Sequence, residues 1–154
     1  MTPLDLITHH EGARLHVYDD ATGHAIGPGY TLVGHPTVGS GRALDTHGIS
    51  EQERQAMLQA DLADADGDVT SIFGGILKSA GDARTAALID MRFELGGAGF
   101  REFKTMIAAI LTWDWNAAAA AALDSLWAKQ VPDRAQEDAE MIRSGNWPAW
   151  AKGS

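Results

Sequence analysis

The chain has 154 residues and a formal net charge of −9, and 45% of its residues are hydrophobic. This length suits one compact domain or two small lobes that share a helix. The acidic excess disfavours a nucleic-acid partner, because phosphates would repel the surface. Without cysteine, the chain has neither a disulfide framework nor a thiolate metal site. We find no secretion signal at the N-terminus and no apolar run long enough to anchor the chain in a membrane.

The first expected element is a short helix over residues 3–11. Thr2 supplies a hydroxyl N-cap, and Pro3 suits the first helical position. Gly12 stands where a helix commonly ends. Glu11 is therefore expected at or near the C-terminal end of this helix.

Residues 13–49 have the pattern of a small antiparallel sheet with long loops. Leu15 and Val17 alternate with polar residues, as in a half-buried strand. Short β-branched runs are separated by clusters of Gly, Pro and Asp, which favour turns. This part of the chain is expected to form a β-containing lobe.

From Ser50 onward the pattern is helical. Ser50 and Glu53 have the spacing of a capping box. The acidic segment 64–71 is expected to link the lobes, and Gly67 within it predicts a break or a bend, because Gly costs about 1 kcal/mol in a helix. Further helices are expected over 83–96, 101–112, 114–127 and 133–143, with Asp133 as the cap of the last. The fold class is then α+β, with a small β lobe, a connecting helix, a helical lobe and a ligand cleft between the lobes.

Glu11, Asp20 and Thr37 are the candidate catalytic residues. Glycoside hydrolysis needs a carboxylic acid that protonates the leaving oxygen and a second carboxylate that activates water or acts as nucleophile. A Glu at a helix end and an Asp in the next loop could supply this pair, and the hydroxyl of Thr37 could hold a water beside Asp20. Acidic residues near loops are common, so composition alone favours solvated surface charges at these positions.

Three blocks of the sequence resemble the phage-type lysozyme family, and they occur in the family's order. The first holds Glu-Gly, Tyr-x-Asp, Gly and Thr-Val-Gly-x-Gly at residues 11–12, 18–20, 23 and 37–41. The second resembles the family's central helix of the C-terminal lobe at residues 87–96. The third is a Trp-x-x-Gln-x-Pro-x-Arg-Ala run at residues 127–135, followed by Gly-x-Trp at 145–147. The resemblance extends from about Leu4 to Trp150.

The resemblance implies a single lysozyme-like domain over residues 1–154. Its β-containing N-terminal lobe would cover 13–60, and its helical C-terminal lobe would cover 70–154 together with helix 3–11. The implied activity is inverting hydrolysis of the β-1,4 bond between N-acetylmuramic acid and N-acetylglucosamine in bacterial peptidoglycan, without a cofactor or metal. The implied setting is phage-mediated lysis by a monomer without a membrane anchor. The enzyme would be made in the host cytoplasm and would reach the periplasmic wall with the help of a holin or of injection machinery.

The family's roles transfer to individual residues. Glu11 would be the general acid, Asp20 the carboxylate that activates water, and Thr37 the residue that holds this water. Arg134 would orient the acid, and the sugar would contact Gly41, Phe93 and Glu94. Trp127 is expected in the helical core, where its indole N–H needs an acceptor, and Glu94 is a candidate for that acceptor.

Departures from the family pattern leave alternatives open. The stretch between Gly23 and Thr37 is longer than in the family, so Thr31 competes with Thr37, although the residues that follow Thr37 favour it. Asp19 also competes with Asp20, although the spacing from Glu11 and the Tyr-x-Asp pattern favour Asp20. The additional residues, 24–36, could form a lid, a loop that contacts substrate or a neutral decoration. Arg42 stands where the family has a histidine, so an ion pair based on that histidine would be lost or rebuilt.

Three other functions compete with hydrolysis by two carboxylates. A lytic transglycosylase would use one Glu and leave anhydro sugars. A metal-dependent amidase would draw on the histidines of the first 50 residues, although none has a paired ligand spacing. A non-catalytic wall-binding or tail module would bind without cutting. The sequence also leaves open whether the chain is a free endolysin or a tail-associated domain, and whether Gly153 and Ser154 are native.

Overall fold

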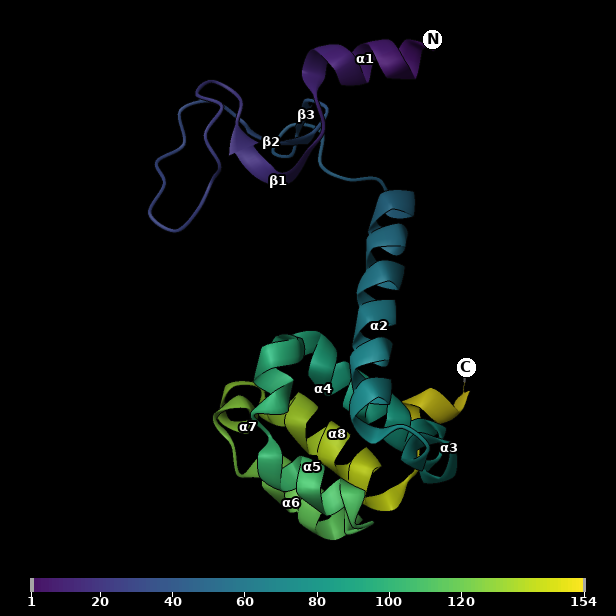
Figure 1. The fold of residues 1–154 in the computed structure, drawn as a ribbon. Helices are drawn as coiled ribbons and strands as arrows, with labels where there is room; N and C mark the ends of the chain where they lie inside the picture. Colours follow the sequence, from purple (N-terminus) through teal and green to yellow (C-terminus); the bar gives the residue numbers. More distant parts are fainter. Residues whose placement is uncertain (1, 154) are drawn as a thin grey trace. The chain divides into compact units, whose positions relative to one another are not determined.

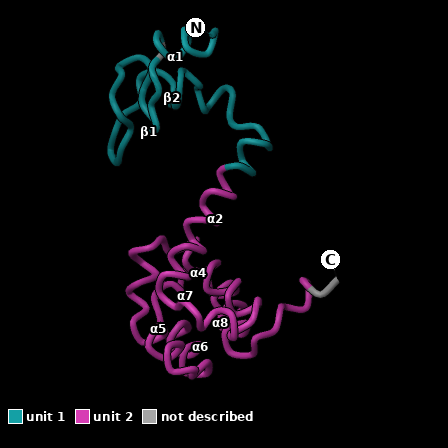
Figure 2. Tube along the Cα trace, turned by 45° about the vertical axis from the view of Figure 1, so that its right-hand side comes forward, with its two compact units in different colours: residues 1–56 teal, residues 57–154 magenta. Residues whose placement is uncertain are grey.

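The computed structural model describes residues 2–153, with the side chains of residues 2–10 and 12–151. The chain divides into two compact units, Met1–Ala56 and Met57–Ser154 (Figure 2). Unit 1 holds one complete helix, a three-stranded antiparallel sheet and the first residues of a second helix that continues into unit 2, and unit 2 is helical. This combination confirms the expected α+β class. Among the described residues, no helix has the length and apolar character to cross a membrane.

Helix α1 (Pro3–Glu11) begins and ends where the sequence predicts. The backbone N–H of Thr2 donates to Asp5 Oδ2 at 2.6 Å, and the Asp5 N–H donates to Thr2 Oγ1 at 3.2 Å, which completes a capping box. Gly12 ends the helix at φ 72°, a conformation that glycine adopts without steric cost. The predicted cap and stop are both confirmed.

The sheet of unit 1 consists of β1 (Arg14–Asp19), β2 (Pro36–Gly39) and β3 (Arg42–Ala43), in that order. Tyr18 pairs with Thr37, whereas the register shifts between Arg14 and Tyr18. Such an irregularity bends a strand, and the ribbon of β1 curves accordingly in Figure 1. The guanidinium of Arg14 lies 4.2 Å from the centre of the Tyr18 ring, so a cation–π contact covers the bent segment.

Helix α2 (Glu51–Phe73) starts at the predicted capping box. The Ser50 N–H donates to Glu53 Oε2 at 2.8 Å, and the Glu53 N–H donates to Ser50 Oγ at 3.3 Å. The predicted break at Gly67 is wrong, because α2 is one continuous helix. Ala65 and Val69, on either side of Gly67, are fully buried in unit 2. Their packing outweighs the roughly 1 kcal/mol that a glycine costs in a helix.

The other elements of unit 2 only partly follow the expected boundaries. Helix α4 runs through residue 96, where a φ of 70° produces a kink, and α8 starts at Pro132, so Asp133 lies in its first turn and is not its cap. The predicted helix 114–127 is two helices, since Ser125 caps a new one by accepting a hydrogen bond from the Ala128 N–H at 3.0 Å. The elements are α3 (Ile76–Ala80), α4 (Asp82–Arg101), α5 (Lys104–Leu111), α6 (Trp115–Leu123), α7 (Leu126–Gln130), α8 (Pro132–Ser144) and η1 (Ala149–Gly153).

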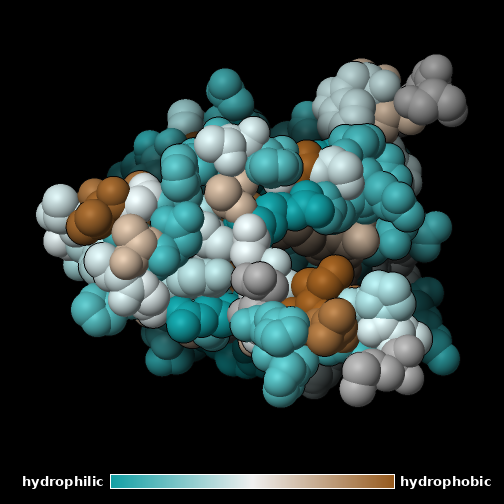
Figure 3. All heavy atoms as spheres, turned by 90° about the horizontal axis from the view of Figure 1, so that it is seen from above, coloured by the Kyte–Doolittle hydropathy of each residue, from teal (hydrophilic) through white to brown (hydrophobic). Residues whose placement is uncertain are grey.

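Helix α8 lies at the centre of unit 2, in contact with α4, α6 and α7 (Figure 1). The core contains Leu88, Met91, Phe100 and Ile142, all fully buried. Burial of such side chains is the main source of stability of a domain. The face drawn in Figure 3 is, in contrast, predominantly hydrophilic with small separate hydrophobic patches.

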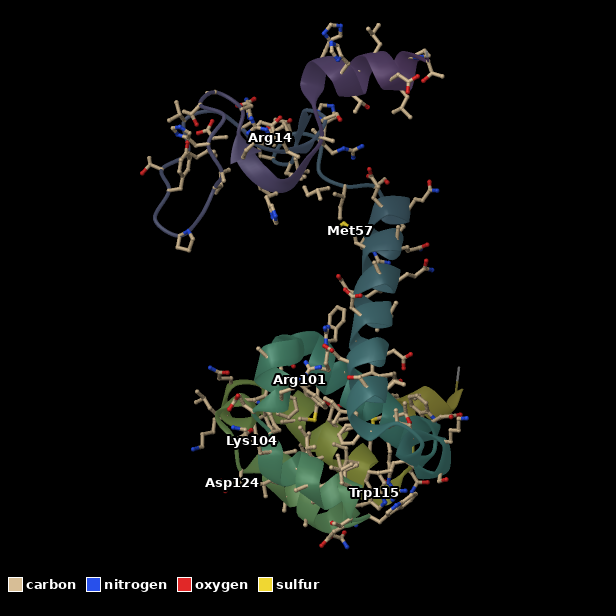
Figure 4. The ribbon with its side chains drawn as sticks, viewed as in Figure 1. Arg14, Met57, Arg101, Lys104, Trp115 and Asp124 are labelled. Atoms are coloured by element: carbon tan, nitrogen blue, oxygen red, sulfur yellow. The ribbon has the colours of Figure 1, made fainter. Side chains whose placement is uncertain are left out.

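An ion-pair cluster fixes α2 to α4 within unit 2. Arg92 Nε donates to Asp68 Oδ2 at 2.8 Å, and Arg101, labelled in Figure 4, donates to Asp68 Oδ1 at 2.8 Å. Residue 97 must be small here, because a Cβ at Gly97 would lie 2.6 Å from Asp68 Oδ2. The two arginines hold the pKa of Asp68 below its ordinary value.

Replacement of Asp68 by Ala should destabilise unit 2, because two arginines would lose a partly buried acceptor. We expect Asp68→Ala to lower the free energy of unfolding, measured by chemical denaturation, by more than a control substitution on the same helix does. Asp66→Ala is the matched control, since Asp66 is exposed on the same helix and forms no ion pair with a described residue. A loss no larger than that of the control would contradict this role.

Asp138 is a buried carboxylic acid on α8, only 4% exposed, and no described residue hydrogen-bonds to its Oδ2. Burial raises the pKa of Asp138 to about 8, and the neighbouring carboxylate of Asp90 adds to the rise while Arg134 opposes it. The side chain is therefore largely protonated at neutral pH. The folded chain holds this proton more tightly than the unfolded chain, so the contribution of Asp138 to stability declines as the pH rises from about 4 to about 8.

We expect Asp138→Asn to remove this decline, because the amide has the shape of the protonated acid but no charge to expose. The variant should match the wild type in melting temperature near pH 4 and exceed it at pH 9 by roughly 5 °C or more. Asp133→Asn, on the exposed first turn of α8, is the control. A difference between variant and wild type that does not change with pH would contradict the assignment.

Candidate functional site

Asp19 and Asp20 are adjacent at the end of β1 but have opposite environments. Asp19 is fully buried and accepts four hydrogen bonds from the loop 20–35. The donors are the backbone N–H groups of Ala21 (3.0 Å), Val33 (2.8 Å) and Gly34 (3.0 Å) and the hydroxyl of Tyr30 (3.0 Å). Asp19 therefore closes the loop that connects β1 to β2.

The charge of Asp19 is stabilised by these contacts. Burial by itself raises the pKa of Asp19, but the hydrogen bonds from Val33, Gly34, Tyr30 and Ala21 together outweigh burial and leave the pKa below its ordinary value. Both carboxylate oxygens are occupied twice. Asp19 therefore has no free oxygen for a water or a substrate.

Asp20 is exposed and has one anchored oxygen. Its Oδ1 accepts a hydrogen bond from the His35 N–H at 2.7 Å, and its own N–H donates to the His35 carbonyl at 3.2 Å. No described residue donates to Asp20 Oδ2. A carboxylate that is oriented through one oxygen and open at the other can accept a proton from water.

Glycine at position 34 leaves room for this arrangement. A Cβ at Gly34 would collide with Asp20 Oδ1 and would lie 2.7 Å from the Ala21 Cβ. Both contacts are far closer than ordinary van der Waals distances. The backbone at residue 34 therefore lies directly against the carboxylate of Asp20.

Thr37 lies on β2 and is 2% exposed. Its hydroxyl donates to the His35 carbonyl at 3.1 Å, so only its lone pairs remain for a water. The structure thus brings Asp20 and Thr37 together, because both side chains bind the main chain of His35. The competing Thr31 is exposed in the loop 20–35.

Glu11 is the last residue of α1, and its side chain lies outside the described residues. The next carbonyl, that of Gly12, accepts a hydrogen bond from Ser40 Oγ at 2.7 Å, which ties the end of α1 to the turn between β2 and β3. Gly41 belongs to the same turn and lines a pocket of about 420 Å³ with Ser40, Arg42, His47, Ile49 and Ser50. Glu11 and Asp20 lie at the two ends of β1.

Arg42 forms an ion pair where the expected histidine is missing. Its Nη1 lies 2.9 Å from Glu53 Oε2, and Glu53 also completes the capping box of α2. The sequence pattern left open whether an ion pair would exist at this position. In this chain, arginine and glutamate supply one.

In unit 2, Glu94 and Arg134 belong to one polar network. Arg134 donates to both carboxylate oxygens of Asp90 at 2.6 and 2.7 Å, and its Nε lies 3.2 Å from Glu94 Oε2. The indole N–H of Trp127 donates to Glu94 Oε2 at 3.1 Å, which confirms Glu94 as the acceptor that Trp127 requires. Phe93, next to Glu94 on α4, is 38% exposed.

Sequence reasoning missed Asp90 and His35, and it named Asp19 only as a competitor of Asp20. Asp90 and Glu94 are four residues apart on one helix, a spacing that puts two carboxylates on the same face and could have indicated an arginine partner. Asp19 and His35 form hydrogen bonds to residues 11 to 15 positions away in the sequence, and no local sequence pattern predicts these hydrogen bonds. Within the described part of the chain, no group of three or more His, Cys, Asp or Glu could hold a metal ion. The predicted cleft between the lobes stays a prediction, as does the assignment of helix 3–11 to the C-terminal lobe.

Comparison with known proteins identifies the same family as the three sequence blocks. The Phage lysozyme family matches residues 8–138. The chain is 31% identical to the pre-baseplate central spike protein Gp5 of Enterobacteria phage T4, over 95% of this chain and 28% of that protein. It is 25% identical to the probable T4-type lysozyme 1 of Dictyostelium discoideum, over 95% of this chain and 96% of that protein. The chain thus spans little more than a quarter of the spike protein. The family match covers most of the chain, which therefore belongs to the phage lysozyme family of glycoside hydrolases.

Proposed function

We propose that this chain is a muramidase that hydrolyses the β-1,4 bond between N-acetylmuramic acid and N-acetylglucosamine in peptidoglycan, with Glu11 as general acid. Membership of the phage lysozyme family supports the peptidoglycan substrate. The observation that carries the mechanism is the state of Asp20, an exposed carboxylate that is held through one oxygen beside Thr37. Both oxygens of Asp19 are already occupied, so we assign Asp19 the structural role of closing the loop 20–35 instead.

The proposed reaction is a single displacement with inversion at the anomeric carbon. Asp20 Oδ2 accepts one proton from a water as the water oxygen attacks the anomeric carbon, and the hydroxyl oxygen of Thr37 accepts a hydrogen bond from the second O–H of that water. Glu11 donates its proton to the leaving oxygen. Inverting enzymes hold the two carboxyl groups roughly 6.5–9.5 Å apart.

The bend of β1 supports this arrangement of Glu11 and Asp20. A straight strand of this length would hold its ends about 20 Å apart, which is too far for the two carboxyl groups to share one sugar bond. The register shift between Arg14 and Tyr18 curves the strand and shortens that separation.

Gly41, Phe93 and Glu94 are the residues that we propose to contact the sugar. Gly41 lines a pocket in unit 1, the exposed ring of Phe93 can pack on a sugar face, and the carboxylate of Glu94 can accept a hydrogen bond from a hydroxyl. For Arg134, whose guanidinium is held by Asp90, the role of orienting the acid stays a prediction.

For the biological setting we propose phage-mediated attack on the bacterial wall by a monomer. One relative is by name a central spike protein of a phage, and the other is by name a probable lysozyme. The first supports delivery with injection machinery, whereas a free endolysin would reach the periplasmic wall from the host cytoplasm with a holin.

We expect Glu11→Gln to abolish lysis, and Asp20→Asn to reduce it by about 10²–10⁴-fold, measured as the fall in turbidity of a peptidoglycan suspension. Circular dichroism melting should show both variants folded, because each substitution keeps the size and shape of the side chain. Near-wild-type activity of Glu11→Gln would remove Glu11 from the acid role.

Asp19→Asn is the matched comparison. It should lower the melting temperature as well as the activity, since two of the four donors would face an amide N–H in place of an oxygen. Should Asp19→Asn keep its melting temperature and lose more activity than Asp20→Asn, the water-activating role would belong to Asp19.

The products distinguish hydrolysis from its alternatives. We expect reducing ends in the α configuration, seen by proton NMR early in the reaction, as inversion of a β bond requires. Anhydro-muramic ends in mass spectrometry would instead identify a lytic transglycosylase. Binding to purified walls without any release of fragments would identify a non-catalytic module.

Gly34→Ala should reduce activity because the added Cβ would displace the carboxylate of Asp20. We expect kcat to fall by at least about tenfold, as misplacement of a reacting group by about 1 Å can cost up to a hundredfold. Gly29→Ala is the control in the same loop, since a Cβ there would meet no atom within 4 Å although its φ of 79° adds strain. Equal activity of the two variants would contradict the role of residue 34.

A further inference from the structure

His35 connects the two residues of unit 1 to which we assign the water. Its backbone N–H donates to Asp20 Oδ1 at 2.7 Å. Its carbonyl accepts from Thr37 Oγ1 at 3.1 Å and from the Asp20 N–H at 3.2 Å. Any displacement of His35 therefore moves Asp20 and Thr37 together.

The side chain of His35 is held by a second contact. His35 Nδ1 lies 2.9 Å from Asp45 Oδ2, and both side chains are roughly half exposed. Asp45 belongs to a well-bonded turn after β3. The Leu44 N–H donates to the Pro36 carbonyl at 2.7 Å, and the Gly48 N–H donates to the Leu44 carbonyl at 3.1 Å. The ion pair therefore links the loop that carries His35 to a fixed point beside the sheet.

The flanking residues restrict His35 further. The Gly34 N–H is bound by Asp19 at 3.0 Å, and Pro36 limits the backbone of the residue before it to extended conformations. Within residues 34–36, the imidazole ring of His35 is thus the group whose position depends on a titratable contact, the ion pair with Asp45.

We propose that the His35–Asp45 ion pair positions Asp20 and Thr37 for the attack of water, and that activity depends on the charge of His35. This inference rests on the proposed function, because it assigns His35 as a positioning residue for that reaction. His35 touches neither substrate nor reacting atoms in this proposal.

The groups that face His35 are Asp45, Asp20 and Asp19, all acidic. The hydrogen bond and the charge of Asp45 raise the pKa of His35 above its ordinary value of 6.5, burial opposes the rise, and Asp20 and Asp19 add to it. The same contact lowers the pKa of Asp45. Because the pKa of His35 is raised, the ion pair is complete at acidic pH and is lost as the pH rises through that raised value.

An exposed ion pair of this kind contributes little to stability. A purely structural role and a positioning role therefore predict different results. The structural role predicts a small change in melting temperature and none in catalysis. The positioning role predicts a fall in kcat that stability does not explain.

The test uses the full chain with the variants His35→Ala, Asp45→Asn and Asp45→Glu. We expect the first two to lower kcat about tenfold, with KM changed by less than about twofold and the melting temperature by less than about 4 °C. Asp45→Glu should restore part of the activity because it keeps the charge. His24→Ala is the matched control, since His24 lies exposed in the same loop and its ring has no described partner.

The pH profile gives a second readout. In the wild type, kcat should decline on the alkaline side with a midpoint above 6.5, and in Asp45→Asn this midpoint should move to lower pH. Unchanged kcat and an unchanged profile in both His35→Ala and Asp45→Asn would overturn the inference. A fall in kcat matched by a collapse of the melting temperature in all three Asp45 and His35 variants would also overturn it.

NMR titration separates this inference from the proposed function. The His35 ring should titrate above pH 6.5 in the wild type and closer to 6.5 in Asp45→Asn, and the carboxyl carbon of Asp20 and the amide of Thr37 should shift with the same midpoint. Full activity of Asp20→Asn would overturn the proposed function and, with it, this inference. If the NMR signals of Asp20 and Thr37 do not shift as His35 titrates, this inference fails while the proposed function stands.

Discussion

The fully buried carboxylate of Asp19 is the contact on which the arrangement of unit 1 depends. It binds backbone N–H groups at both ends of the loop 20–35 and the hydroxyl of Tyr30 in between. A buried charge is tolerated only when its oxygens are satisfied, and here both are. Because Asp19 keeps Gly34 in place, the next peptide, that of His35, meets the side chains of Asp20 and Thr37. The loop 20–35 is therefore connected to the candidate site by a series of hydrogen bonds.

Unit 2 uses charge in a different way. Glu94 accepts the indole N–H of Trp127 and lies close to Arg134, which is held in turn by Asp90. Asp138 stands beside the same charges but is itself largely protonated at neutral pH. The carboxylate of Glu94 thus adds negative charge to this network, and Arg134 offsets that charge locally. Although the whole chain carries an acidic excess, the partly buried carboxylates of this network are paired with an arginine.

Local features of the structure followed from the sequence, and long-range ones did not. The caps at Thr2 and Ser50 were predictable because the donor and acceptor lie three residues apart. The acceptor for Trp127 was predictable because a buried indole N–H needs one and few candidates exist. The continuity of α2 at Gly67 was not, since burial of the neighbouring Ala65 and Val69 overrides helix propensity.

The candidate site shows the same division. The sequence blocks placed Glu11, Asp20 and Thr37 in order, but the distinction between Asp19 and Asp20 depends on donors 11 to 15 residues away in the chain. No periodicity or motif encodes such contacts. The role of His35 was equally hidden, because its contacts to Asp20 and Thr37 use main-chain atoms that every residue type has.

The tip of the loop 20–35 has a consequence for protein engineering. The Ile26 N–H donates to the Val17 carbonyl at 3.0 Å, and the Tyr30 N–H donates to the Gly27 carbonyl at 3.0 Å, so the chain turns tightly between them. Pro28 and Gly29 are exposed at this tip. They lie in the sequence between the Ile26–Val17 hydrogen bond and the hydrogen bonds that Val33 and Gly34 donate to Asp19. Exposed tips of this kind accept foreign sequence well. A peptide epitope or a wall-targeting sequence inserted between these two residues would be displayed at the tip of a loop that the Ile26 hydrogen bond and the hydrogen bonds to Asp19 close below it.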